Sequence, residues 1–234
     1  DEGKRRLATV ADTVLERENK GFDVWGYKEA QEHFGWERLA EYDELILLNY
    51  TFFGPIFPFS ELFDRMDAQD VDFWGITSHE AVTPHPHHGV GSMAGHIQSH
   101  WIAVRREMFL SDEYRSYWTD MPMITSYFDS IDRHEGRFTS HFASLGFVYE
   151  LAFPSGDYPS QHPIFDNISL MLDDRLPILK RRIFFHDPDY LDRQAIIGRD
   201  VTDRLEEAGF PLDLIWSNVV RSAKPRVLHT NFSL

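Results

Sequence analysis

Residues 42–58 read YDELILLNYTFFGPIFP, and this stretch decides the expected fold. Glu44 to Leu48 supplies a short run of leucine and isoleucine, too short for a free-standing helix and apolar enough for a strand buried on both faces, as in a parallel sheet. Asn49, Tyr50 and Thr51 follow at its carboxyl end. Because ligands of open α/β sheets bind beyond the carboxyl ends of strands, this polar tip is a candidate binding site.

The segments on either side alternate between helical and extended patterns, as an α/β sheet requires. We expect helices over residues 7–18 and 25–33, and one over residues 61–67 with Ser60 as its N-cap. Residues 71–77 and 147–153 are β-branched and aromatic and predict strands. Residues 96–108 predict a strand that runs into a helix, and further helices are expected over 112–118, 126–145 and 201–208. We expect one domain over residues 1–234.

A long segment at residues 78–95, SHEAVTPHPHHGVGSMAG, has no helix or strand pattern. Loops of this length in compact domains are often functional lids, although a mobile surface loop is the plain alternative. His85, His87 and His88 could form a zinc site, which would suit a metal-dependent hydrolase. No carboxylate or fourth histidine stands at a regular spacing beside them, so a solvated loop is the favoured interpretation.

Composition excludes several classes of protein. The 234 residues include 38 acidic and 23 basic ones, a formal net charge of −15, which argues against a general nucleic-acid surface. There is no cysteine, so disulfides and thiolate metal sites are excluded. No apolar run approaches the roughly 18 residues that a membrane-spanning helix needs. A basic cluster, Lys180 to Arg182, could meet a diphosphate or a lipid phosphate, but a solvated face is the favoured interpretation.

Four blocks occur in a fixed order: ENKGFDVWGYKEA at 18–30, the opening stretch at 42–58, DVDFWGITSH at 70–79 and HIQSHWIAVRREMF at 96–109. Together they resemble the rhamnan-synthesis protein F family, bacterial enzymes that build rhamnose-rich cell-surface polysaccharides. The resemblance covers most of residues 17–190. It implies a GT-A glycosyltransferase fold, which is Rossmann-like, with a mostly parallel sheet flanked by helices.

The resemblance also implies an activity and a place. The expected reaction moves rhamnose or a related sugar from a nucleoside-diphosphate sugar to a polysaccharide or lipid-linked glycan acceptor, in the cytoplasm at the inner face of the membrane. GT-A folds usually begin with a strand and a nucleotide-binding loop before the block at 18–30, whereas only 16 residues precede Arg17 here. The chain is therefore expected to lack that first strand, as a fragment would. A catalytically silent module that binds glycan or a partner enzyme is the alternative.

The same resemblance assigns roles to residues. Glu135 is the expected catalytic base, with Asp132 in reserve, although carboxylates near a helix start are often only solvated. The expected acceptor contacts are His96, Gln98 and Ser99. The expected donor contacts are Asn19, Asp23, Asn49 and Thr51, of which Asn19 and Asp23 also suit a plain turn.

A divalent cation, Mg²⁺ or Mn²⁺, usually neutralises the leaving diphosphate in GT-A enzymes. The family's motif at the strand end resembles Asn-Asp-Ser, whereas this chain has Asn49-Tyr50-Thr51. Tyr50 thus replaces the expected carboxylate, and only neutral oxygens remain. Asn49 is the expected ligand there, with His186, or else His229, as a late histidine ligand.

Overall fold

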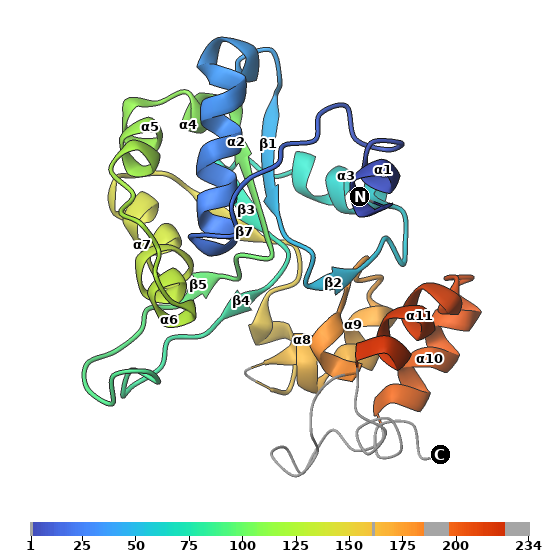
Figure 1. The fold of residues 1–234 in the computed structure, drawn as a ribbon. Helices are drawn as coiled ribbons and strands as arrows, with labels where there is room; N and C mark the ends of the chain where they lie inside the picture. The colour runs from blue at the N-terminus through green and yellow to red at the C-terminus, as the bar shows by residue number, and fades with distance from the viewer. Residues whose placement is uncertain (1, 161, 185–196, 223–234) are drawn as a thin grey trace.

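A four-stranded sheet lies at the centre of the molecule (Figure 1). The structure is a computed structural model that describes residues 2–160, 162–184 and 197–222. In spatial order the sheet consists of β1 (Glu44–Leu48), β6 (Trp101–Arg105), β3 (Phe73–Gly75) and β7 (Tyr149–Leu151). Two short ladders join other segments: β2 (Phe52–Phe53) pairs with β8 (Leu179–Lys180), and β4 (Ser78–His79) pairs with β5 (His96–Ile97).

The strand directions correct the expectation of a mostly parallel sheet. β6 runs antiparallel to β1 and to β3, and β3 with β7 is the one parallel pair among the described strands. The chain leaves β3 through β4, turns in the loop of residues 80–95, and returns through β5 and β6, so that these four strands form one interrupted hairpin. A hairpin return is antiparallel by construction, which the apolar composition of the strands could not reveal.

The position of β1 also differs from the expectation. Its bounds agree with the predicted strand, but β1 lies at an edge of the described sheet rather than in its interior. Leu47 is buried, whereas Leu48 is 46% exposed. The strands buried on both faces are β3, whose three residues are all buried, and β6, whose first four residues are all buried.

Side chains of the central strands pack alternately into two hydrophobic cores, because successive strand residues point to opposite faces of the sheet. Trp74, Trp101 and Ala103 enter the first core. Phe73 and Ile102 enter the second. The sheet therefore separates two layers of helices, as Figure 1 shows.

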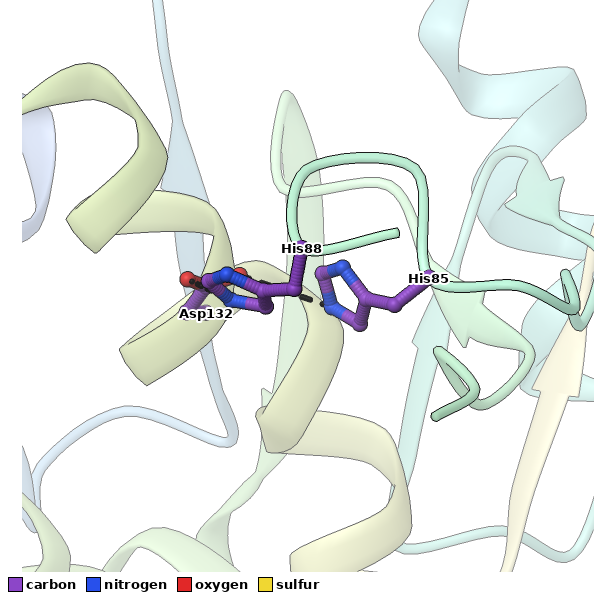
Figure 2. A group of neighbouring side chains, drawn as sticks. All are labelled: His85, His88 and Asp132. Carbon is purple, nitrogen blue, oxygen red and sulfur yellow. Dashed lines mark hydrogen bonds and ion pairs between the residues drawn. The ribbon is translucent and has the colours of Figure 1, made fainter. Parts of the chain in front are cut away.

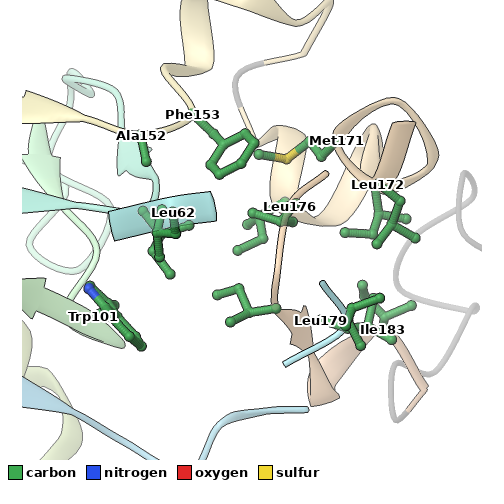
Figure 3. Packing of buried hydrophobic residues seen from close by; sticks show 14 of the residues in the cluster. Leu62, Trp101, Ala152, Phe153, Met171, Leu172, Leu176, Leu179 and Ile183 are labelled. Atoms are coloured by element: carbon green, nitrogen blue, oxygen red, sulfur yellow. The ribbon is translucent and has the colours of Figure 1, made fainter. Parts of the chain in front are cut away.

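The first core is covered by α3 and by the helices after β7. Figure 3 shows Leu62 of α3 and Trp101 of β6 facing Met171, Leu176 and Leu179 across this core. The covering elements are α3 (Phe59–Asp67), a 3₁₀ turn (Ser155–Asp157), α8 (Pro163–Asp166), α9 (Ile168–Asp173), a second 3₁₀ turn (Arg181–Phe184), α10 (Ile197–Glu207) and α11 (Leu212–Ser222).

The second core is covered by the helices that precede β1 and follow β6. These are α2 (Phe22–Leu39), α4 (Arg106–Phe109), α5 (Asp112–Thr119), α6 (Tyr127–Ser130), a π-helix (Ile131–Glu135) and α7 (Gly136–Ser144). Gly136 N donates to Ile131 O, five residues earlier, which is the π-type bond. The predicted helix over residues 126–145 is thus present, with a π segment inside it.

Two helix predictions need correction. The amphipathic helix expected over residues 7–18 is not there: α1 spans Glu2–Leu7, has no buried residue, and is followed by irregular chain. Leu7 and Val10 are exposed, so their spacing reflects no core contact. In addition, α3 begins after Pro58, and Ser60 lies inside the helix instead of capping it. No helix in the described ranges is long and apolar enough to cross a membrane.

Candidate functional site

The site forms where three strand ends meet. β1 ends at Leu48, which pairs with the first residue of β6, so that Asn49 lies beside His100 and donates from its backbone N to His100 O at 3.4 Å. Thr77, beyond β3, accepts a backbone bond from Gln98 N at 3.0 Å. The antiparallel return of β6 therefore places residues 98–100 at the same sheet edge as the carboxyl ends of β1 and β3.

A pocket of about 1350 Å³ opens at this edge. Six segments of the chain line this pocket. They include most of the residues that were predicted from the sequence to form the site. These are Asn19, Asp23, Asn49, Thr51, His96, Gln98, Ser99 and Glu135. Asp132 is not among the lining residues, and His186 and His229 lie outside the described residues.

A chain of hydrogen bonds runs along one wall of the pocket. Asn49 Nδ2 donates to Asp23 Oδ2 at 2.8 Å, and Asn49 Oδ1 accepts from Thr51 N at 3.1 Å and from Thr51 Oγ1 at 2.6 Å. Lys180 Nζ in turn donates to Thr51 Oγ1 at 2.6 Å. The polar tip of β1 is therefore held rigidly and connects α2 to β8.

Lys180 brings positive charge to the tip of β1. The β2–β8 ladder, with Phe52 opposite Lys180, sets its position. Burial lowers the pKa of Lys180 to about 8, and the negative charges of Glu135 and Asp23 oppose that shift. Arg181 and Arg182 also line the pocket. The guanidinium of Arg181 lies 5.5 Å from the ring centre of Tyr50 and donates to Tyr50 O at 3.2 Å.

Glu135, the last residue of the π-helix, also lines the pocket. Its Oε2 accepts from Ser99 N at 3.2 Å and from the Ser99 hydroxyl, and its Oε1 lies 3.8 Å from His96 Nε2. Burial raises the pKa of Glu135, but the interaction with His96 and the hydrogen bonds from Ser99 outweigh burial and lower the pKa to about 2. Glu135 is therefore an ionised carboxylate, held in place by two of the predicted acceptor contacts.

Three histidines, His79, His96 and His100, line the same pocket as Glu135. His96 Nδ1 donates to Ala94 O at 2.8 Å, and its ring stacks on His79 with centroids 5.2 Å apart. His100 is buried, and burial, with the charge of Lys180, lowers its pKa well below the usual value. Within the described residues, His100 Nε2 has no hydrogen-bond partner. A buried ring nitrogen without a partner at a pocket wall suits a ligand or a water molecule.

The strand end does not suit a divalent cation in this arrangement. Both lone pairs of Asn49 Oδ1 are taken by Thr51, and Thr51 Oγ1 already accepts from the ammonium of Lys180. Tyr50, which stands where a carboxylate was expected, is 80% exposed. Mg²⁺ prefers several oxygen ligands, carboxylates above all, whereas this wall offers an ammonium group.

Asp132 lies instead beside the loop of residues 80–95 (Figure 2). Its Oδ2 is 2.8 Å from His88 Nε2, and its Oδ1 is 3.6 Å from His85 Nε2. No local sequence pattern pairs this loop with Asp132, because 44 residues separate His88 from Asp132. The sequence near these histidines contains no carboxylate at a regular spacing. In the folded chain, Asp132 supplies a carboxylate beside them.

Several pocket residues were not nominated from the sequence. Lys180 was interpreted as part of a solvated face, and Tyr27, His79 and His100 were not singled out. The block at 18–30 and the block at 96–109 contain Tyr27 and His100, so the resemblance itself was the available signal. Lys180 lies 129 residues from Thr51, and only the folded chain brings the two together.

Comparison with known proteins agrees with the sequence blocks. A family model described as "Rhamnan synthesis protein F" matches residues 1–233. A protein of Sinorhizobium fredii (strain NBRC 101917 / NGR234), described as "Uncharacterized protein y4gN", is 23% identical over 145 residues, which make up 62% of this chain and 36% of that protein. The chain thus spans about a third of the curated relative that it matches. No solved structure matches the chain significantly.

Proposed function

Since the chain belongs to the rhamnan synthesis protein F family, and so to polysaccharide biosynthesis, we propose that it transfers a sugar from a nucleoside-diphosphate donor to a glycan acceptor. The observation that carries this proposal is one pocket that holds both cations and a carboxylate. Lys180 and Arg181 contact Thr51 and Tyr50 at the tip of β1, and Arg182 and the carboxylate of Glu135 line the same pocket. Glycosyl transfer needs both: cations for the leaving diphosphate and a base for the acceptor hydroxyl.

The donor is proposed to bind with its diphosphate at the tip of β1. Lys180 offers an ammonium group that is already positioned by Thr51, and the two arginines add guanidinium groups, which suit phosphate oxygens. Asp23 and Asn49 lie next to this point and could contact the ribose or the sugar of the donor. This arrangement assigns charge neutralisation to the protein's own cations, so that millimolar Mg²⁺ is expected to change donor affinity little.

Glu135 is proposed as the base. In the transfer, the acceptor hydroxyl gives its proton to Glu135, its oxygen forms the bond to the anomeric carbon, and the bond from that carbon to the diphosphate oxygen breaks. A single displacement of this kind inverts the anomeric configuration. With a pKa near 2 the carboxylate is ionised but weakly basic, so the acceptor hydroxyl has to replace the Ser99 hydroxyl as its partner.

The proposed partners follow from this chemistry. The acceptor is a polysaccharide or a lipid-linked glycan, held by His96, Gln98 and Ser99 on the Glu135 side of the pocket. Nucleotide sugars are made in the cytoplasm, and we place the protein there, with peripheral contact at the inner face of the membrane. Rhamnose or a related deoxyhexose is the proposed sugar.

One observation favours a second candidate, a silent module that binds glycan without transferring sugar. Tyr50, the residue in place of the expected carboxylate, projects into solvent at the mouth of the pocket. An exposed aromatic ring suits stacking on a sugar face. Donor binding separates the two candidates, because a silent module would retain oligosaccharide binding without binding nucleotide sugars.

The deciding experiment is the substitution Glu135→Gln, which keeps the shape and removes the base. Transfer is expected to fall by about 10² to 10⁴-fold, as for loss of a general base, while the donor dissociation constant stays within a few-fold. Glu113→Gln, at an exposed carboxylate of α5, is the matched control. Near-normal turnover in Glu135→Gln would remove Glu135 from the mechanism, and failure of the wild type to bind any nucleotide sugar would favour the silent module.

A further inference from the structure

A second polar cluster lies at the rim of the pocket and is not used by the proposed transfer. We define the histidine loop as residues 80–95, which carry His85, His87 and His88. Figure 2 shows His85 and His88 beside Asp132 of the π-helix. We propose that this cluster binds one divalent transition-metal ion of the zinc class, and that the ion fastens the histidine loop to the π-helix.

The spacing of the ligand atoms fits such an ion. One ring nitrogen each from His85 and His88 and one oxygen of Asp132 lie within 4.8 Å of one another. A tetrahedral ion with bonds of 2.0–2.1 Å places its ligand atoms about 3.3 Å apart. Asp132 lies 2.8 Å from His88, 3.6 Å from His85 and 3.7 Å from His87 Nδ1. Small side-chain shifts would therefore bring His85, His88 and Asp132 to coordination distance, with His87 next to Asp132.

Two atoms of the cluster point to a missing partner. Asp132 Oδ1 and His87 Nδ1 are both buried and, among the described residues, neither has a hydrogen bond. They face each other at 3.7 Å, too far for a hydrogen bond and suitable for two ligands of one ion. Buried polar atoms without a partner are rare in folded proteins and call for an ion or a water molecule.

The histidine loop is built to present these rings. Val82 and Met93 form a bridge at its base, and His85 N donates to Gly91 O at 2.9 Å. Gly89 and Gly91 have φ values of 68° and 74°, the left-handed conformation that glycine adopts without strain. The rings of His85 and His88 consequently lie 4.5 Å apart, centre to centre.

Binding has two local costs. The first is the hydrogen bond of 2.8 Å between His88 Nε2 and Asp132 Oδ2, which coordination through His88 Nε2 breaks, and the second is at His85. His85 Nδ1 accepts a long hydrogen bond, 3.3 Å, from the backbone N of His87. Coordination through His85 Nε2 puts the ring proton on Nδ1, so that this bond is lost. The bonds of imidazole and carboxylate to a zinc-class ion, and the partner gained by Asp132 Oδ1, offset both losses.

The ion would act on the neighbouring pocket through two short connections. Pro86, His87 and Met93 of the histidine loop line the pocket, and Asp132 lies three residues before Glu135 on the same π-helix. Fixing the loop to Asp132 therefore fixes one rim of the pocket and the helix that carries Glu135. The metal is a positioning element here and takes no part in the transfer.

Zinc titration of the metal-free protein tests the site without any sugar donor. We expect one equivalent to bind to the wild type, and His85→Ala with His88→Ala to remove that equivalent. Asp132→Asn should weaken binding by at least about tenfold, since it removes a charged ligand. His33→Ala, at an exposed histidine of α2, is the control and should bind as the wild type does. Cobalt in place of zinc should give the visible absorption of a tetrahedral site.

Hydrogen exchange of the loop amides tests the fastening. Zinc is expected to slow exchange at residues 85–92 in the wild type and in His33→Ala, and to leave Asp132→Asn unchanged. Equal zinc stoichiometry in the wild type and the double histidine variant would overturn the site. Zinc binding without slower exchange in the loop would overturn the fastening. Neither result depends on whether the protein transfers sugar, so the two proposals fail separately.

Discussion

At the scale of single residues, Lys180 shows how position changes the meaning of a charge. In the sequence it belongs to a basic run that a solvated face explains, because nothing local distinguishes it. In the fold it lies against Thr51, partly buried, and burial brings its pKa down to about 8. A lysine with that pKa is charged at neutral pH and loses its charge within the range of ordinary assays.

We predict that donor binding weakens above pH 8. The ammonium form that meets the diphosphate predominates below the pKa of about 8 and is lost as the pH rises through it, so affinity should fall from pH 8 to pH 9. Lys180→Arg should keep affinity and abolish this pH dependence, because arginine stays protonated. Lys180→Met should lower donor affinity by about 10 to 100-fold at pH 7. Calorimetry from pH 7 to 9 measures all three, and a pH profile shared by wild type and Lys180→Arg would contradict the assignment.

Most of the site residues predicted from the sequence line one pocket. Asn19, Asp23, Asn49 and Ser99 belong to sequence blocks that together resemble one family, and each of these blocks contributes residues to the same pocket. Asp132 and Lys180 could not be placed in this way. Their contacts, with His88 and Thr51, connect segments far apart in the chain, and no local pattern encodes such a contact.

At the scale of elements, the sequence located strands better than it paired them. Its leucine and isoleucine content predicts β1 over Glu44–Leu48, as observed. Burial on both faces was then assumed to mean a parallel, central strand, whereas β1 is antiparallel to β6 and lies at an edge. Pairing depends on the hairpin through the histidine loop, and a glycine- and proline-rich loop hides that hairpin from periodicity arguments.

Gly75 of β3 marks the point where this hairpin is packed most tightly. A Cβ atom at Gly75 would lie 2.1 Å from Ile97 Cγ2 and 3.2 Å from Trp101 O. Gly75→Ala should therefore lower the free energy of unfolding by about 1–3 kcal/mol, as overpacked cores do. Urea unfolding measures the change. Gly156→Ala, where a Cβ would meet nothing within 4 Å, should stay within about 0.5 kcal/mol of the wild type; equal effects at the two glycines would contradict the packing argument.

At the scale of the whole molecule, the pocket draws on residues from Arg17 to Arg182. It exists only when these segments are folded together, so a pocket ligand binds the native state and raises its stability by mass action. We predict that the correct nucleotide sugar, at about 100 times its dissociation constant, raises the melting temperature by about 5 °C or more. A thermal-shift screen over donors with different bases and sugars measures this. Lys180→Met should show a smaller shift; an equal shift would place the donor elsewhere.

A ligand in this pocket would also affect how the two hydrophobic cores, one on each side of the sheet, unfold. Glu135 is the last residue of the π-helix, which packs against Phe138 of the second core, whereas Lys180 lies in the chain between Leu179 and Ile183 of the first. A donor and an acceptor bound to Lys180 and to Glu135 would therefore connect one core to the other. Binding should then make the unfolding of the two layers more cooperative, because neither core can melt without releasing the same ligand.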